Sequence, residues 1–193
     1  MKIVITGGPG TGKTSIINKL ENIGHSVFHE SSREIIKKYK ELGHDQLFLS
    51  NPIKFSELLL EKRSLQFIQS VEKNDKFCFF DRGMPDILAY LNYKKIKGCG
   101  LNGFDDDSPK VVQKIYQFCL IEQFRYDLVF ILEPWLEIYK NDEQRYESFE
   151  EVIKIDKSIK ETYSKLGWKY IIVPKDKLDK RVDFIISKLS SEI

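Results

Sequence analysis

Residues 7–14 read Gly7-Gly8-Pro9-Gly10-Thr11-Gly12-Lys13-Thr14 and match the phosphate-binding pattern GxxxxGK[ST]. The apolar run 3–6 precedes this stretch, and residues 15–20 continue it with a helical pattern. A strand, a glycine-rich loop and a helix in this order gather backbone N–H groups and the positive end of a helix dipole at one point. Residue frequencies give on the order of 0.007 chance matches in a chain of this length. The stretch therefore predicts a cradle for a polyphosphate at the end of a buried strand.

Each residue type in this loop has a physical reason. Gly7 and Gly12 permit positive φ and a close approach of the backbone to phosphate oxygens. The Lys13 ammonium can bridge β- and γ-phosphates, and the Thr14 hydroxyl can coordinate Mg²⁺. We therefore expect ATP and Mg²⁺ as ligands. The expected nucleotide-binding residues are Gly7, Gly8, Pro9, Gly10, Thr11, Gly12, Lys13, Thr14 and Ser15.

Apolar runs alternate with longer amphipathic stretches along the whole chain. Strands are expected at residues 3–6, 26–29, 77–80, 128–132 and 170–173. Helices are expected after Pro52, after Ser108-Pro109, after Glu133-Pro134, and from about Lys177 to Leu189. Several of the strands are continuously apolar, which is typical of parallel strands covered on both faces. The alternation predicts an α/β fold: an open parallel sheet between two layers of helices.

The apolar residues of the helix after Pro52 predict which of its faces is buried. Its apolar face is predicted to contain Phe55, Leu58, Leu59, Leu65 and Ile68. Glu57, Lys62 and Arg63 fall on its other faces, where charged side chains are usually solvated.

Composition limits the classes of protein that the chain can represent. Its 193 residues favour one domain, 1–193, and 31 basic against 29 acidic residues leave a net charge of +2, which argues against nucleic acid as the main partner. The three cysteines do not combine with histidines at zinc-ligand spacing. No stretch reaches the ~18 apolar residues of a membrane span, and the first residues have no signal-peptide core. We expect a cytoplasmic protein without a transmembrane segment.

A second apolar run ends in an acid, Asp81, which is followed by Arg82. A carboxylate at the carboxyl end of a parallel strand lies where ligands bind in such sheets and where nucleotide-bound Mg²⁺ is held. The alternative is that Asp81 caps the next helix, which Met84-Pro85-Asp86 can equally start. Arg82 either clamps a phosphoryl oxygen or neutralises Asp81. We expect Asp81 to bind metal and both residues to be catalytic.

Glu30 follows the strand at 26–29 and is the candidate general base for an acceptor hydroxyl. Helix capping competes with this interpretation, because Ser31 and Glu34 have the spacing of a capping box.

The polar segment after the fourth strand, at about 134–150, is the expected lid. A lid at this position can bring an arginine onto the transferred phosphoryl group, and Arg145 is the candidate, with Lys140 beside it. The competing interpretation is a solvated helix face. The guanine-selecting pattern Asn-Lys-x-Asp is missing after the fifth strand, where the chain reads Pro174-Lys175-Asp176-Lys177, so ATP is favoured over GTP.

Together these residues resemble a known family, the AAA-type predicted ATPases of the NadR/TRPL-translocation-defect group. The resemblance is carried by Gly7–Thr14, His29-Glu30-Ser31-Ser32-Arg33-Glu34, Phe79–Gly83 with Pro85–Tyr90, and Pro134–Tyr139. It spans nearly the whole chain. It implies a P-loop sheet in the kinase-like order 2-3-1-4-5, Mg-nucleotide binding, and relatives that include nicotinamide riboside kinase domains and nucleotide- and lipid-binding regulators.

The resemblance also transfers roles to single residues. Lys13 and Thr14 match the phosphate-loop positions, and Asp81 matches the acid at the end of the third strand. Glu30 resembles the carboxylate that deoxynucleoside kinases place after their second strand, and Arg82 resembles their following basic residue. Because Asp81-Arg82-Gly83 differs from the riboside-kinase segment, nicotinamide riboside is not assumed as the acceptor.

Two functions are therefore expected in competition. The first is an ATP-dependent phosphotransferase or ATPase that phosphorylates a nucleoside or another small hydroxyl-bearing metabolite. The second is a nucleotide-binding switch or slow NTPase that acts through a protein or lipid partner. The expected partners are a nucleoside triphosphate and an unidentified small-molecule acceptor, with a homodimer left open.

Overall fold

The computed structural model describes residues 1–43, 47–73, 75–94, 110–139 and 147–190. Its centre is one parallel sheet in the strand order β2-β3-β1-β4-β5, which confirms the predicted kinase-like order. The strands are β1 (Lys2–Gly7), β2 (Ser26–Phe28), β3 (Cys78–Asp81), β4 (Leu128–Leu132) and β5 (Ile171–Val173). Because all of these strands are parallel, their carboxyl ends meet at a single edge.

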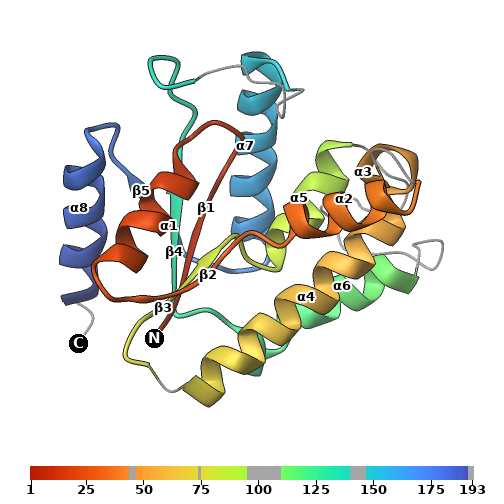
Figure 1. The fold of residues 1–193 in the computed structure, drawn as a ribbon, viewed down its shortest axis with the longest axis horizontal. Helices are drawn as coiled ribbons and strands as arrows, with labels where there is room; N and C mark the ends of the chain where they lie inside the picture. Colours follow the sequence, from red (N-terminus) through yellow and green to blue (C-terminus); the bar gives the residue numbers. More distant parts are fainter. Residues whose placement is uncertain (44–46, 74, 95–109, 140–146, 191–193) are drawn as a thin grey trace.

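Helices cover both faces of this sheet. They are α1 (Lys13–Asn22), α2 (Ser32–Glu41), α3 (Leu47–Ser50), α4 (Pro52–Lys73), α5 (Pro85–Tyr93), α6 (Lys110–Leu120), α7 (Phe149–Lys165) and α8 (Leu178–Ser190), with a 3₁₀ turn at Glu122–Phe124. Figure 1 shows α1 and α8 on one side of the sheet and α4 to α7 on the other. The predicted three-layer α/β architecture is confirmed.

Two hydrophobic cores follow from the alternation of side chains along the strands. Ile3 and Ile5 of β1 face α1 and α8, whereas Val4 faces the larger cluster under α4 to α7. Phe79 and Phe80 of β3 divide between the two cores in the same way. Continuously apolar strands are therefore buried on both faces, as their composition predicted.

The prediction of a helix directly after the fourth strand is wrong. The helix expected after Glu133-Pro134 is a single turn, in which Ile138 and Tyr139 donate backbone hydrogen bonds to the Trp135 carbonyl. The helix α7 begins instead at Phe149, because Ser148 and Glu151 form a complete capping box there.

The buried face of α4 also differs from the prediction. Leu65 and Ile68 are exposed, whereas Leu60, Arg63 and Phe67 are buried. Arg63 on the buried side pairs with Glu30, which lies outside α4, and the periodicity of one helix does not reveal such a contact.

Among the described residues, no helix combines the length and the apolar character that a membrane crossing requires.

Candidate functional site

The phosphate loop joins β1 to α1 at the carboxyl edge of the sheet. Gly7 has φ of 144°, and a Cβ there would lie 2.3 Å from the Leu132 carbonyl oxygen of β4. Gly12 has φ of 88° and is the residue before α1, whose first turn has no side-chain cap. The free N–H groups of that turn and the helix dipole are therefore available to an anion. The loop has the backbone geometry that the sequence predicted.

Lys13 folds back over this loop. Its Nζ donates to the carbonyl oxygens of Gly7 and Gly8, at 2.9 and 2.6 Å. The side chain is only 8% exposed. Burial, with repulsion from Arg82, lowers the pKa of the Lys13 ammonium to about 7, against the attraction of Asp81 and other nearby carboxylates. The ammonium is thus held beside the anion cradle in a place where its positive charge is poorly compensated.

This low pKa predicts that triphosphate binding takes up a proton above neutral pH. The free protein at pH 8.5 carries mostly neutral Lys13, whereas phosphate oxygens restore the charged form and raise the pKa again. The observed affinity should then fall by up to about tenfold per pH unit above pH 7. Calorimetric titration with ATP in two buffers of different ionisation enthalpy measures the uptake. We expect close to one proton at pH 8.5 and almost none at pH 6, and equal values at both would contradict the prediction.

Glu30 lies just beyond β2 and is bound by two arginines. Its Oε1 accepts from Arg63 Nη2 at 3.1 Å and from the Ser32 backbone N–H at 3.1 Å, and its Oε2 pairs with Arg82 Nε. Arg63 also donates to the Gly83 carbonyl at 2.8 Å. Burial raises the pKa of Glu30, but Arg63 and Arg82 outweigh it and lower the pKa below its ordinary value. Glu30 is therefore an ionised, oriented carboxylate.

The capping alternative for this segment does not apply to Ser31. Ser31 makes no side-chain cap hydrogen bond to α2, and the Ser32 N–H is instead bound by Glu30. Glu30 therefore contributes to the start of α2 and faces the arginines at the same time.

Arg82 connects Glu30 to the phosphate loop. Its Nη1 donates to the Gly7 carbonyl at 3.2 Å and lies 3.5 Å from an Asp86 carboxylate oxygen, and the guanidinium stacks 5.0 Å from the Tyr90 ring centroid. Despite burial, the nearby Tyr90 and the carboxylates raise the pKa of Arg82 above its ordinary value. Arg82 also has a positive φ of 78°, which is uncommon for a residue with a Cβ. Its permanent charge is fixed next to the loop.

Asp81 ends β3 beside Ile5 of β1. It is buried, and its Oδ1 has no hydrogen-bond partner among the described residues. Burial and the neighbouring Glu30 raise the pKa of Asp81. Asp81 does not cap α5, because the N-cap residue of α5 is Met84 and no side chain makes a cap hydrogen bond there. A buried carboxylate oxygen without a donor fits a cation, so the donor set suits Mg²⁺ held with the exposed hydroxyl of Thr14.

No protein-only metal cluster of three or more histidine, cysteine, aspartate or glutamate residues occurs within the described ranges. The oxygen ligands of a Mg²⁺ ion here would therefore come partly from phosphate and water, as that ion prefers.

Asp86 belongs to this site, although the sequence analysis did not identify it as functional. It is 1% exposed and accepts hydrogen bonds from Thr6 Oγ1, from the Tyr163 hydroxyl at 2.7 Å and from the Gly83 N–H at 2.8 Å. It also pairs with Arg82. One carboxylate thus joins β1, the turn before α5, and α7. Its only sequence signal is an acid in the first turn of a helix, which is common in surface helices.

Replacing Asp86 by alanine should destabilise the fold by about 3–5 kcal/mol, because Arg82 and the hydroxyls of Thr6 and Tyr163 would lose a buried partner. Urea unfolding measures this loss. The matched control is Asp179→Ala, which removes an exposed carboxylate paired with Lys19 and should change stability by less than about 1 kcal/mol. Equal effects of the two substitutions would contradict the assignment.

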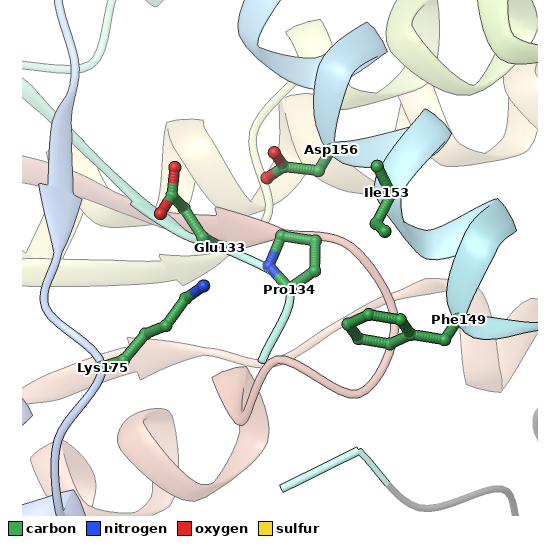
Figure 2. A pocket seen from close by; sticks show the side chains of 6 residues that line it. All are labelled: Glu133, Pro134, Phe149, Ile153, Asp156 and Lys175. Carbon is green, nitrogen blue, oxygen red and sulfur yellow. The ribbon is translucent and has the colours of Figure 1, made fainter. Parts of the chain in front are cut away.

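A pocket of about 330 Å³ lies beside the phosphate loop, between the ends of β4 and β5 and the first turns of α7. It is lined by Glu133, Pro134, Phe149, Ile153, Asp156 and Lys175 (Figure 2). Lys160 bridges the two acids, 2.5 Å from Glu133 and 2.8 Å from Asp156. A Cβ on Gly8 would lie 2.9 Å from a Val152 side-chain carbon, so α7 packs directly against the phosphate loop. The same helix also forms one wall of the pocket. Lys13, Glu30, Asp81 and Arg82 do not line this pocket.

The structure therefore brings Lys13, Glu30, Asp81 and Arg82 to one edge of the sheet, and adds Arg63 and Asp86. Thr14 and Ser15 are exposed on the first turn of α1. Arg145 and Lys140, the candidate lid residues, lie outside the described residues.

Comparisons with known proteins identify the family and the fold of the chain. A protein-family model described as an AAA domain matches residues 2–181. A search of curated proteins finds no match. Among solved structures, deoxyadenosine kinase from M. mycoides with the products dCMP and dCDP superposes with a TM-score of 0.68 at 20% identity, over 99% of this chain and 100% of that one.

Two further structures share the fold. The same M. mycoides enzyme with bound dATP gives a TM-score of 0.67 at 22% identity, over 98% of this chain and 100% of that one. Thymidylate kinase from Candida albicans gives 0.62 at 16% identity, over 99% and 91%. At these identities the likeness establishes the fold, that of the P-loop nucleoside and nucleotide kinases. Since the family model matches nearly the whole sequence, the chain belongs to the AAA domain family.

Proposed function

We propose that this protein is a small-molecule kinase that transfers the γ-phosphoryl group of ATP to a hydroxyl group of a nucleoside. The observation that carries the proposal is the meeting of Glu30, Arg82 and Asp81 with the phosphate loop at one sheet edge. A phosphate loop alone binds a triphosphate. Here an ionised carboxylate, Glu30, is bound to Arg82, and Arg82 donates to the loop, so the carboxylate is placed to activate an acceptor hydroxyl. Nucleoside kinases of the same fold, such as the deoxyadenosine kinase, support the class of acceptor.

In the proposed reaction each of these residues has a separate role. The acceptor oxygen attacks the γ-phosphorus, the bond from that phosphorus to the β–γ bridging oxygen breaks, and the hydroxyl proton passes to the Glu30 carboxylate. Lys13 and Arg82 bind the negative charge that spreads over the phosphoryl oxygens, and ADP leaves with its bridging oxygen. The protein therefore acts mainly by positioning and charge.

Mg²⁺, when bound, would neutralise phosphate charge and orient the triphosphate, and Asp81 and Thr14 are the residues that would hold it. We further propose that residues 1–193 form a single domain and that residues 134–150 act as its lid. Arg145 of this lid would place an additional positive charge next to the transferred phosphoryl group.

Glu30 keeps free acceptor capacity for this role. A carboxylate has about four lone-pair positions, and the described donors to Glu30 are the Ser32 N–H, Arg63 and Arg82. Its low pKa means that it stays ionised at neutral pH, so a hydroxyl can donate to it without prior deprotonation of Glu30.

The experiment is a measurement of ADP formation with ATP and Mg²⁺ across a panel of ribonucleosides and deoxynucleosides. We expect at least one nucleoside to raise the rate far above the rate with water alone, and the Lys13→Ala variant gives the blank. Slow hydrolysis that no nucleoside accelerates would contradict the kinase and favour the nucleotide-dependent switch.

A further inference from the structure

Arg181 reaches the phosphate loop from the other end of the chain. It lies in the first turn of α8, yet its side chain is only 5% exposed. Its Nη2 donates to the Thr11 carbonyl at 2.9 Å. Its Nη1 lies 2.8 Å from the position that a Cβ on Gly12 would occupy. The guanidinium therefore lies directly against the loop, and glycine at position 12 leaves the space for it.

This buried charge has no counter-charge among the residues that the structure describes. Within the described ranges, no carboxylate lies within ion-pair distance of Arg181, and its Nε has no hydrogen-bond partner. Burial without a compensating acid lowers the pKa of Arg181 below its ordinary value. An unpaired buried charge is unfavourable unless something else supplies the opposite sign. The phosphate loop, which the guanidinium contacts, is the neighbouring anion-binding site.

The contact also sets the direction of one peptide group. In a trans peptide the C=O of one residue and the N–H of the next point in opposite directions, and no cis peptide occurs in the described chain. Because Arg181 binds the Thr11 carbonyl oxygen, the Gly12 N–H points away from Arg181. Gly12 directly precedes α1, so this N–H belongs to the loop's set of anion-facing donors.

We propose that Arg181 is a positioning residue for nucleotide binding: it orients the Thr11–Gly12 peptide, and its positive charge on the far side of that peptide attracts the polyphosphate. The inference rests on the proposed binding of a triphosphate to residues 7–14. It makes α8 a part of the nucleotide site, since the last helix is attached to the first loop through this side chain.

Thermal unfolding with and without ATP and Mg²⁺ tests the inference. For the parent, ATP at about 100 times its Kd should raise the unfolding midpoint by roughly 5–10 °C. For Arg181→Met we expect an unchanged or higher midpoint without ATP, because an unpaired buried charge is removed together with one hydrogen bond. The same ATP concentration should then give about half of the parental rise or less, since Kd increases about tenfold or more.

Two further variants make the test specific. Lys180→Met removes a positive charge from the same turn, at a side chain that is 70% exposed, and should match the parent in both measurements. Arg181→Lys keeps the charge and should recover most of the ATP-induced rise; if the methionine variant does not fold, this variant decides by the same two measurements.

The outcomes separate the inference from the proposed function. A variant at Arg181 that unfolds at a lower temperature without ATP but keeps the full parental rise would show a purely structural arginine and overturn the inference. A parent that ATP and Mg²⁺ do not stabilise at all would overturn both the inference and the proposed function.

Discussion

Replacement of Lys13 by methionine is expected to lower acceptor-dependent phosphoryl transfer about a hundredfold to a thousandfold or more. The Lys13 ammonium lies over the loop carbonyls of Gly7 and Gly8, in the place where the triphosphate would bind. Removing it takes away a buried charge-assisted donor that water cannot replace in the closed site. Initial rates of ADP formation with the best nucleoside measure the loss.

The control for this substitution is Lys19→Met in the same helix. Lys19 is partly exposed and pairs with Asp179 rather than with the site. We expect its rate to stay within about twofold of the parent, because exposed ion pairs contribute little. Circular dichroism should show that both variants are folded. Equal rates for Lys13→Met and the parent would remove Lys13 from the reaction.

The Glu30→Gln substitution should lower acceptor-dependent turnover about a hundredfold to ten-thousandfold while leaving ATP binding within about threefold. Glutamine keeps an oxygen that can accept from Arg63 and from the Ser32 N–H, but it cannot take the proton of the acceptor hydroxyl. The measurement is kcat with saturating nucleoside, together with the Kd for ATP from calorimetry.

Glu34→Gln is the matched control for this second substitution. Glu34 is an exposed glutamate on α2 that pairs with Lys62 at 3.0 Å. Its variant should turn over like the parent. Should Glu30→Gln also retain the parental kcat, Glu30 is not the base, and its place between Arg63 and Arg82 serves only to hold these arginines.

The sequence predicted the phosphate loop and the sheet because strict local requirements decide both. Gly7 and Gly12 occupy conformations that favour glycine, so their spacing is readable without a structure. Strands such as β4 are continuously apolar because both faces are buried, and this composition is also a local property. The strand order itself came from the resemblance to a family and is confirmed.

The contacts of charged residues far apart in the chain were not predictable in this way. The pattern of α4 placed Arg63 on a polar face, but it is buried because Glu30, 33 positions earlier, is its partner. Asp86 and Arg181 were missed for the same reason, since their partners lie on β1, α7 and the phosphate loop. A single sequence shows periodicity along one helix, not which charges meet across helices.

Local capping patterns were only partly reliable. Ser31 with Glu34 has the capping-box spacing, but the Ser31 side chain makes no cap bond, and the Ser31 backbone is helical (φ −79°, ψ −18°) rather than extended as in a capping box. Ser148 with Glu151 forms the box in full and starts α7, well after the Pro134 at which a helix was expected. Capping spacings recur by chance, and only the tertiary contacts select the one that is used.

The most direct test of the central claim follows the γ-phosphoryl group itself. ATP labelled with ¹⁸O in its γ-phosphate is incubated with the protein, Mg²⁺ and a nucleoside mixture, and the products are separated by mass spectrometry. We predict a labelled nucleoside monophosphate that the Lys13→Met variant forms at least about a hundredfold more slowly. Label that appears only in inorganic phosphate, or remains in ATP, would contradict the account.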